Sequence, residues 1–251
     1  EIEVPIQKKN REKALFKNKQ YDDDDRPLPA LVNKDKQQNN PFGGEEQDYS
    51  KEAEFLTAEN QKLAEPLIPV IGEDIARRIF SRTWNIREEG LKTLDQEVRL
   101  ESRSKVLNYS DPGAAFVALF GVVSHTINDK IVQVAQKSMG LLQTLLTKEP
   151  RNIGNRNELN AYVDTVVTGL LDRIGDSNIK TRELAEQSFM ALVKSPAVTC
   201  NYCVAALVKP PPTGQSVKHK TANSTKHILA KLGLLRQIIQ DFGINNQNVP
   251  Y

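Results

Sequence analysis

From Glu65 onward the sequence alternates apolar stretches of helical spacing with short polar breaks, and this repetition constrains the fold more than any other feature. Apolar residues that recur every three or four positions indicate helices with one buried face. Strand-like alternation is absent from this part of the sequence. A single helix pair is too thin to bury its own apolar face, so neighbouring pairs must stack into a continuous core. The pattern therefore predicts an all-α protein.

The first predicted helix pair contains a break at residues 81–84. Apolar residues from Leu67 to Ile79 form the inner face of its first helix, and Leu91, Leu94 and Val98 that of its second. Asn85 and Glu88 stand three residues apart, as in a capping box at the start of the second helix.

Further along the chain, Asp111-Pro112 places a capping residue and a first-turn proline where a helix prefers them. We expect that helix to extend to a break near residue 125. The other predicted helices span 130–146, 158–174, 179–193, 197–208 and 226–242.

The helix pairs repeat with a nearly constant length. Gly90, Ala135 and Ala185 are taken as equivalent positions, separated by 45 and 50 residues. Two-helix units of about 40 to 47 residues are typical of HEAT and armadillo repeats. We therefore predict a HEAT-repeat α-solenoid of about four helix pairs over residues 65–251.

The N-terminal region has a different composition. Charge blocks and polar runs in residues 1–49 predict an extended, disordered linker, in which the proline-stiffened segment 25–31 is either plain linker or a short docking segment. Residues 50–64 predict a lead-in helix with Ser50 as its cap. The chain begins EIEVPIQKKN, without an initiator methionine or an apolar signal core, so we expect a fragment of a longer cytoplasmic chain.

Composition argues against several functions. No apolar run approaches the roughly 18 residues that span a bilayer, and a net charge of +2 is too balanced for a general nucleic-acid binder, so neither membrane nor nucleic acid is expected as a partner. No glycine-rich phosphate loop or nucleophile elbow is present, so we expect neither an enzyme nor a cofactor. Cys200 and Cys203 lack the further ligands that a structural zinc site needs and the preceding strand of a redox motif. We interpret them as small apolar residues on one helix face.

The turns within the helix pairs are the best candidates for a binding site, because in a solenoid they line up along one edge. Trp84, the only tryptophan, lies in the first turn, either as a buried capping residue or as an exposed anchor. Asp176 and Arg182 stand six residues apart across the third turn, which predicts a structural ion pair. The candidate binding residues of the four turns are Trp84, Asn85, Arg87, Asn128, Lys130, Asn178, Lys180, Lys220 and Lys226.

Two segments resemble a known family. GEDIARRIFSRTWNIREEGL (72–91) resembles the opening repeat of TOG domains, the tubulin-binding HEAT arrays of microtubule regulators, and LLDRIGDSNIKTRELAEQSF (170–189) resembles their third repeat. More narrowly, SRTW, REEGL and the upstream DRPLPAL are similar to the member with a single TOG domain at centrosomes and ciliary tips. TOG domains usually contain six repeats, whereas we count four here.

The resemblance implies binding of αβ-tubulin through the turns. Trp84 would be the apolar anchor in the first turn, with Lys130 in the second, Lys180 in the third and Lys220 or Lys226 in the fourth. It also implies a role at microtubule plus ends, a place in the cytoskeleton at the ciliary tip, axoneme, centriole or basal body, and partners among ciliary-tip or centriolar proteins. A HEAT adaptor that binds a different protein remains the alternative, and nucleic-acid binding through the lysine-rich fourth loop is a third.

Overall fold

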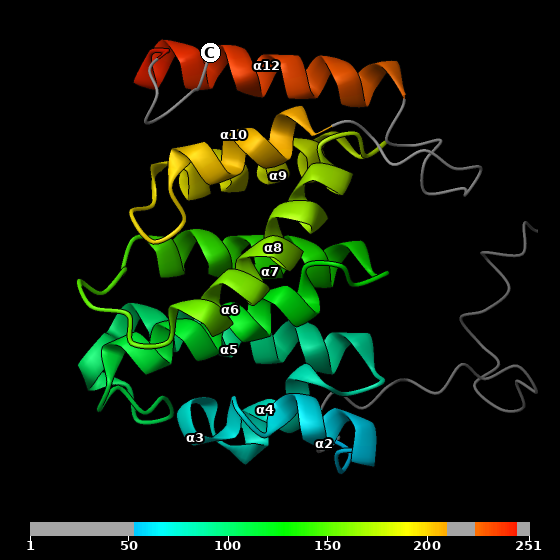
Figure 1. Ribbon diagram of the computed structural model, residues 1–251. Helices are drawn as coiled ribbons and strands as arrows, with labels where there is room; N and C mark the ends of the chain where they lie inside the picture. The colour runs from blue at the N-terminus through cyan, green and yellow to red at the C-terminus, as the bar shows by residue number, and fades with distance from the viewer. Residues whose placement is uncertain (1–52, 210–223, 245–251) are drawn as a thin grey trace, which may run out of the picture. The chain divides into compact units, whose positions relative to one another are not determined.

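The computed structural model describes residues 53–209 and 224–244, and all regular secondary structure in these ranges is helical (Figure 1). The all-α prediction is therefore confirmed. The helices are α2 (Ala58–Ala64), α3 (Ile68–Ile71), α4 (Glu73–Ile79), α5 (Trp84–Leu100), a 3-10 turn η1 (Glu101–Arg103), α6 (Pro112–Thr126), α7 (Val132–Leu146), α8 (Arg156–Arg173), α9 (Ile179–Lys194), α10 (Cys200–Val208) and α12 (Thr225–Phe242).

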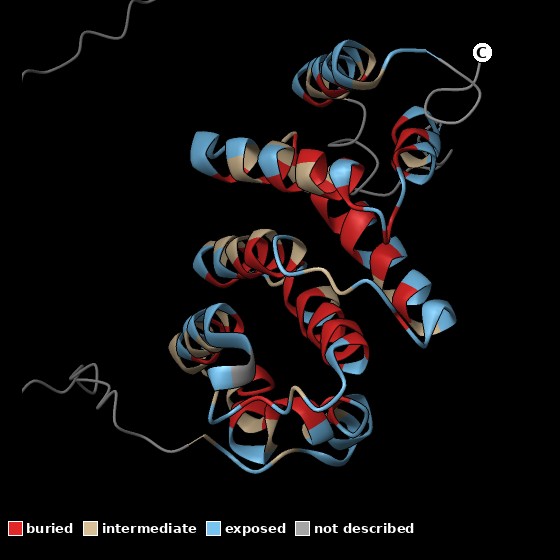
Figure 2. Ribbon diagram, turned by 90° about the vertical axis from the view of Figure 1, so that its left-hand side faces the viewer, coloured by how far each residue is buried: buried red, intermediate tan, exposed pale blue. Residues whose placement is uncertain are grey.

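The helices from α3 to α12 form two packed rows. One row contains α3 with α4, then α6, α8 and α10, and the other contains α5, α7, α9 and α12. Each helix of the first row packs against the next helix of the chain in the second row, and helices within a row also touch their neighbours. Figure 2 shows the buried residues gathered where helices face one another. Phe116, Phe120 and Phe189 are among the largest fully buried side chains of this core.

The second-row helices start at a regular interval that fixes the repeat register. Their N-caps are Thr83, Ile131, Asn178 and Ser224, at spacings of 48, 47 and 46 residues. In this register Gly90 is equivalent to Ser138 and Ala185, so the equivalence predicted for Ala135 is wrong by three residues. All three equivalent positions are buried and small. At Gly90 an added Cβ would lie only 3.0 Å from the Cβ of Arg78, so a side chain there would push α5 away from α4.

Polar side chains join the second-row helices to one another. The Thr144 hydroxyl of α7 donates to Asp95 of α5 at 2.5 Å and accepts from Arg99 at 2.8 Å. Between α7 and α9, Gln136 donates to Thr181 and Gln143 to Ser188, each at 2.9 Å. Because these groups are paired across half-buried positions, they hold the repeats in one register without a penalty for unsatisfied polar atoms.

Several local predictions need correction. The lead-in helix predicted for 50–64 covers only Ala58–Ala64 among the described residues, and its cap is Thr57, whose side chain accepts from the Asn60 amide. The first helix of the first pair is split by Gly72, whose φ of 76° favours glycine. The capping box at Asn85 and Glu88 is wrong, since the N-cap of α5 is Thr83. The linker predicted for 1–49, with its segment 25–31, lies outside the described residues.

Other local predictions are confirmed. The Asp111 side chain accepts from the Gly113 and Ala114 amides, and Pro112 occupies the first turn of α6. The remaining predicted helices are present, with ends that differ by at most three residues. Cys200 and Cys203 are both buried on α10, as small apolar residues would be, and burial raises the pKa of Cys203 to about 12. None of the described helices has the length and apolar character needed to cross a bilayer.

Candidate functional site

Three turns between paired helices are built in the same way. We call them turn 1 (80–83), turn 2 (127–131) and turn 3 (174–178). In each, a side-chain oxygen accepts from the backbone amide two residues further on: Ser81 from Thr83 at 3.1 Å, Asp129 from Ile131 at 2.8 Å and Asp176 from Asn178 at 2.8 Å. Such local bonds favour a tight turn and position the next helix start.

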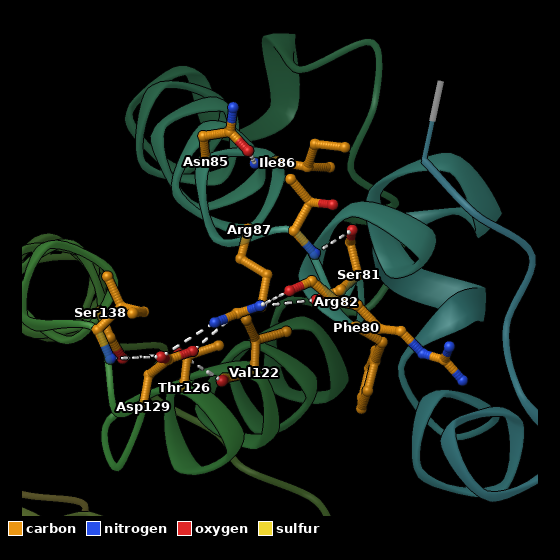
Figure 3. A network of polar contacts seen from close by, with 12 residues as sticks. Phe80, Ser81, Arg82, Asn85, Ile86, Arg87, Val122, Thr126, Asp129 and Ser138 are labelled. Carbon is orange, nitrogen blue, oxygen red and sulfur yellow. Dashed lines mark hydrogen bonds and ion pairs between the residues drawn. The ribbon is translucent and has the colours of Figure 1, made fainter. Parts of the chain in front are cut away.

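Turns 1 and 2 are joined by Arg87 of α5 (Figure 3). Its guanidinium forms a bidentate ion pair with Asp129, at 2.7 and 3.1 Å, and also donates to the carbonyls of Ser81 at 2.8 Å and Arg82 at 3.0 Å. The two charged side chains are only 15% and 11% exposed, so the pair is largely screened from water. Arg87 was predicted to be a binding residue. That prediction is not supported by its geometry, because the guanidinium is directed into the turns and its donors are used there.

Turns 2 and 3 are linked by Arg173, the last residue of α8. It donates to the carbonyls of Ile127 at 2.9 Å and Asp129 at 2.7 Å, both in turn 2, while turn 3 begins at the next residue. Turn 2 is therefore held from both sides, by Arg87 from the first repeat and by Arg173 from the third. The three turns must consequently lie along one edge of the domain.

Turn 3 is closed by Arg182 of α9. Arg182 donates to the carbonyls of Asp176 at 2.7 Å and Ser177 at 3.2 Å, at the same sequence offsets as Arg87 in turn 1. The predicted ion pair between the Asp176 and Arg182 side chains is thus corrected to a bond with the Asp176 backbone. The predicted structural role of both residues agrees with this geometry.

Apolar side chains occupy the first position of α5, α7 and α9 along this edge. Trp84 is 39% exposed, Val132 is half-buried and Ile179 is 61% exposed, all at equivalent positions. Trp84 was predicted to be either a buried capping residue or an exposed anchor, and its exposure at the edge agrees with an anchor. Together with Val132 and Ile179 it forms an apolar row. Sequence reasoning missed Val132 and Ile179, although alignment on the N-caps would have found them.

Cationic side chains flank this row. Arg82 and Lys130 are equivalent positions of turns 1 and 2, and Lys180 and Lys226 are equivalent second positions of α9 and α12. All four are exposed, and none of their side chains makes an ion pair within the described part of the chain. Sequence reasoning missed Arg82, which had been treated as part of the break.

The remaining candidates differ in their availability. Asn128 is exposed in turn 2, whereas Asn178 uses its side-chain oxygen to cap α9 through the Thr181 amide. Asn85 is half-buried, and its side-chain oxygen accepts from the Ile86 amide at 3.1 Å. Lys220 lies outside the described residues. The structure thus brings the candidates of turns 1 to 3 to one edge and adds Lys226 at the start of α12.

The chain matches a family model described as the TOG domain of centrosomal protein CEP104, over residues 61–249. It belongs to this TOG-domain family. The family resemblance seen in segments 72–91 and 170–189 is thereby confirmed.

Individual relatives agree with this TOG assignment. The human centrosomal protein of 104 kDa is 27% identical over 202 residues, which cover 76% of this chain and 20% of that protein. The human mitogen-activated protein kinase kinase kinase 1 is 26% identical over 159 residues, covering 54% of this chain and 10% of that protein. This TOG chain thus spans about a fifth or less of these relatives.

Solved structures show the same fold. The TOG domain of human Cep104 superimposes with a TM-score of 0.60 at 24% identity, covering 79% of this chain and 73% of that one. A second structure, entitled CEP104 TOG domain, gives a TM-score of 0.58 at 22% identity over 78% of this chain and 74% of that one.

Proposed function

We propose that this TOG domain binds the αβ-tubulin heterodimer through the edge formed by turns 1 to 3 and the start of α12. The observation that carries the proposal is the exposed Trp84 in an apolar row with Val132 and Ile179, on turns fixed by the half-buried arginines Arg87 and Arg173. Exposed tryptophan in a rigid setting is enriched at binding hot spots, because little entropy is lost when it is covered.

The cations beside the row support an acidic partner such as tubulin. Lys130, Lys180 and Arg82 have exposed side chains that are not neutralised by an internal ion pair, as described above. Exposed charges of this kind mainly increase the rate of encounter, whereas burial of the apolar row slows dissociation. Binding should therefore weaken when the salt concentration rises.

The deciding experiment measures binding of purified tubulin by size-exclusion chromatography and by titration. Trp84→Ala should weaken binding by about 2 kcal/mol, roughly 30-fold. Val106→Ala is a matched control, since Val106 is 40% exposed but lies in the segment between α5 and α6, which no turn of the edge includes. Equal affinity of Trp84→Ala and the unchanged protein would refute the proposed edge.

The cellular role is proposed on the family assignment. The domain would act without enzymatic activity as part of a centriolar and ciliary-tip protein that helps to regulate microtubule plus ends and cilium structure. Such a role needs partners in the cytoskeleton and neither membrane nor nucleic acid. Stable capture of another protein without any tubulin retention would instead support the adaptor alternative.

A further inference from the structure

A groove lies across α5, α7 and α9 and is lined by both polar and apolar side chains. Figure 1 shows these successive second-row helices side by side. The volume of the groove is about 670 Å³, within the range of roughly 300 to 1,000 Å³ typical of ligand sites. It extends from Lys180, near turn 3, to Arg99 at the far end of α5. None of the apolar edge residues Trp84, Val132 and Ile179 lines it, so the groove adjoins the proposed tubulin edge and shares only Lys180 with the residues assigned to that edge.

The groove carries an excess of positive charge. Its acidic side chains are already neutralised within α5, Glu88 by Lys92 at 3.0 Å and Asp95 by Arg99 at 3.1 Å. Two further cations line the groove, Lys137 of α7 and Lys180 of α9. Neither forms an ion pair among residues 53–209 and 224–244. The unpaired ammonium groups favour a ligand with negative charge.

The neutral side chains of the groove suit a peptide main chain. Gln96 of α5 and Gln133 of α7 both line it, and neither side chain makes a hydrogen bond with another described residue. Each primary amide can donate and accept, which matches the alternating N–H and C=O groups of an extended peptide. Amides on neighbouring helices would hold such a peptide across the row.

Gly140 leaves the middle of the groove open. It lies inside α7, where glycine costs about 1 kcal/mol relative to alanine. An added Cβ would have no atom within 4 Å, so packing does not require glycine here. Gly90, by contrast, is required by the close approach of α4. Position 140 therefore leaves the lining of the groove free of any large side chain that would occupy the space of a ligand.

We infer that this groove binds an extended acidic peptide segment of a partner protein, in addition to whatever the turn edge binds. The unpaired lysines would attract its carboxylates, the two glutamines would pair with its main chain, and the absence of a side chain at position 140 would admit it. This inference does not depend on tubulin binding.

The test is a titration of the full 251-residue chain into a fluorescein-labelled peptide of ten residues that alternates glutamate with glycine, followed by fluorescence anisotropy. We expect saturable binding that weakens with added salt, and no binding of the matched lysine–glycine peptide. Gly140→Met, which fills the groove without changing charge, should weaken binding by about tenfold or more, whereas Gly140→Ala should retain it.

Charge variants separate the groove from general attraction to a basic surface. Lys137→Glu should also lower affinity by about tenfold or more, whereas Lys105→Glu, an exposed change of equal charge outside the groove, should alter it by less than about twofold. Thermal melts confirm that each variant is folded. Failure of the acidic peptide to bind, or equal losses in Lys137→Glu and Lys105→Glu, would overturn the inference. Tubulin binding of Gly140→Met should be unchanged, so a failure of the groove is distinguishable from a failure of the edge.

Discussion

Two contacts between successive repeats, which we call joints, fix neighbouring parts of the edge in different ways. The first joint connects turns 1 and 2, and the second connects turn 3 to α12. In the first, Arg87 forms a largely buried bidentate ion pair with Asp129 and binds two carbonyls of its own turn. In the second, His227 of α12 packs against Gly175 so closely that an added Cβ would meet its ring atoms at 3.0 Å. His227 is 3% exposed, and its Nδ1 atom is buried with no hydrogen-bond partner among residues 53–209 and 224–244.

The difference shows that successive repeats along one edge need not be held with equal rigidity. A polar joint with fixed donors and acceptors sets a single orientation, so Trp84 is held by contacts that reach into the next repeat. A close apolar fit such as that of His227 holds α12 by shape, supported by an exposed Lys194–Asp241 pair at 3.9 Å, which contributes little. We therefore expect the first joint to be stiffer than the second.

The largest effect is expected from Asp129→Ala, which leaves Arg87 without its charge partner. Loss of one member of a buried pair should lower the free energy of unfolding by about 3 kcal/mol. Urea titration followed by circular dichroism measures this loss. Asp74→Ala is the matched control, because Asp74 pairs with Arg78 at an exposed site and should cost less than about 0.5 kcal/mol. Similar losses in both variants would show that burial does not strengthen the first joint.

A sharper test compares two arginines at equivalent positions. Arg87→Met should lower the free energy of unfolding by about 2 kcal/mol, because it removes the charge partner of Asp129 and a donor to two carbonyls. Arg182→Met should cost only about 1 kcal/mol, since it removes bonds within turn 3 alone. The same urea titrations decide the order, and a larger loss for Arg182→Met would show that the contact of Arg87 with turn 2 adds no stability beyond that of bonds within a single turn.

The apolar row offers a smaller change, in binding rather than folding. Ile179→Ala should weaken tubulin binding by about 1 kcal/mol. The free energy of unfolding should change by less than about 0.5 kcal/mol, because the Ile179 side chain is 61% exposed. Val106→Ala again serves as the control outside the edge. Unchanged affinity of Ile179→Ala would confine the anchor to turn 1.

The smallest effect concerns pH at the second joint. Burial lowers the pKa of His227 below its usual 6.5, Lys231 lowers it further and Asp172 opposes the shift. The unfolded chain therefore takes up a proton first as the pH falls below 6.5, and stability should decline by a few tenths of a kcal/mol or more between pH 7 and 5.

His227→Asn removes this titration, so its stability should depend less on pH over the same range, as measured by thermal melts in matched buffers. His125 is more exposed than His227, although desolvation by neighbouring groups also lowers its pKa and its ring centroid lies 4.2 Å from that of Phe80. An unchanged pH slope in His227→Asn would show that the second joint does not respond to protonation.

The sequence was sufficient for the fold because helical periodicity and caps are local signals. Asp111-Pro112 identified the start of α6, and the break at residues 175–178 identified turn 3. The register was less secure, since small buried residues recur at several places along a helix and Ala135 was mistaken for the equivalent of Gly90. N-caps would have been better markers than small residues.

The polar joints could not be predicted because their contacts are not local. Arg87 and Asp129 are 42 residues apart, and Arg173 reaches turn 2 across more than 40 residues. From the sequence alone, Arg87 resembles a ligand contact because it lies close to Trp84. Arg173 resembles a solvent-exposed charge because it lies at the end of a helix. Arg87 is instead directed toward the Asp129 carboxylate, and Arg173 toward the carbonyls of Ile127 and Asp129, groups that only the stacked repeats bring within reach.

Asp129 closes its own turn and neutralises an arginine of the preceding repeat. In a mutational screen for loss of tubulin binding, substitutions at this aspartate would therefore be identified together with substitutions at Trp84, although the aspartate faces inward. A substitution at Asp129 would weaken binding by displacing Trp84 rather than by removing a contact with tubulin. The two causes are distinguished by measuring whether the free energy of unfolding falls together with the binding affinity.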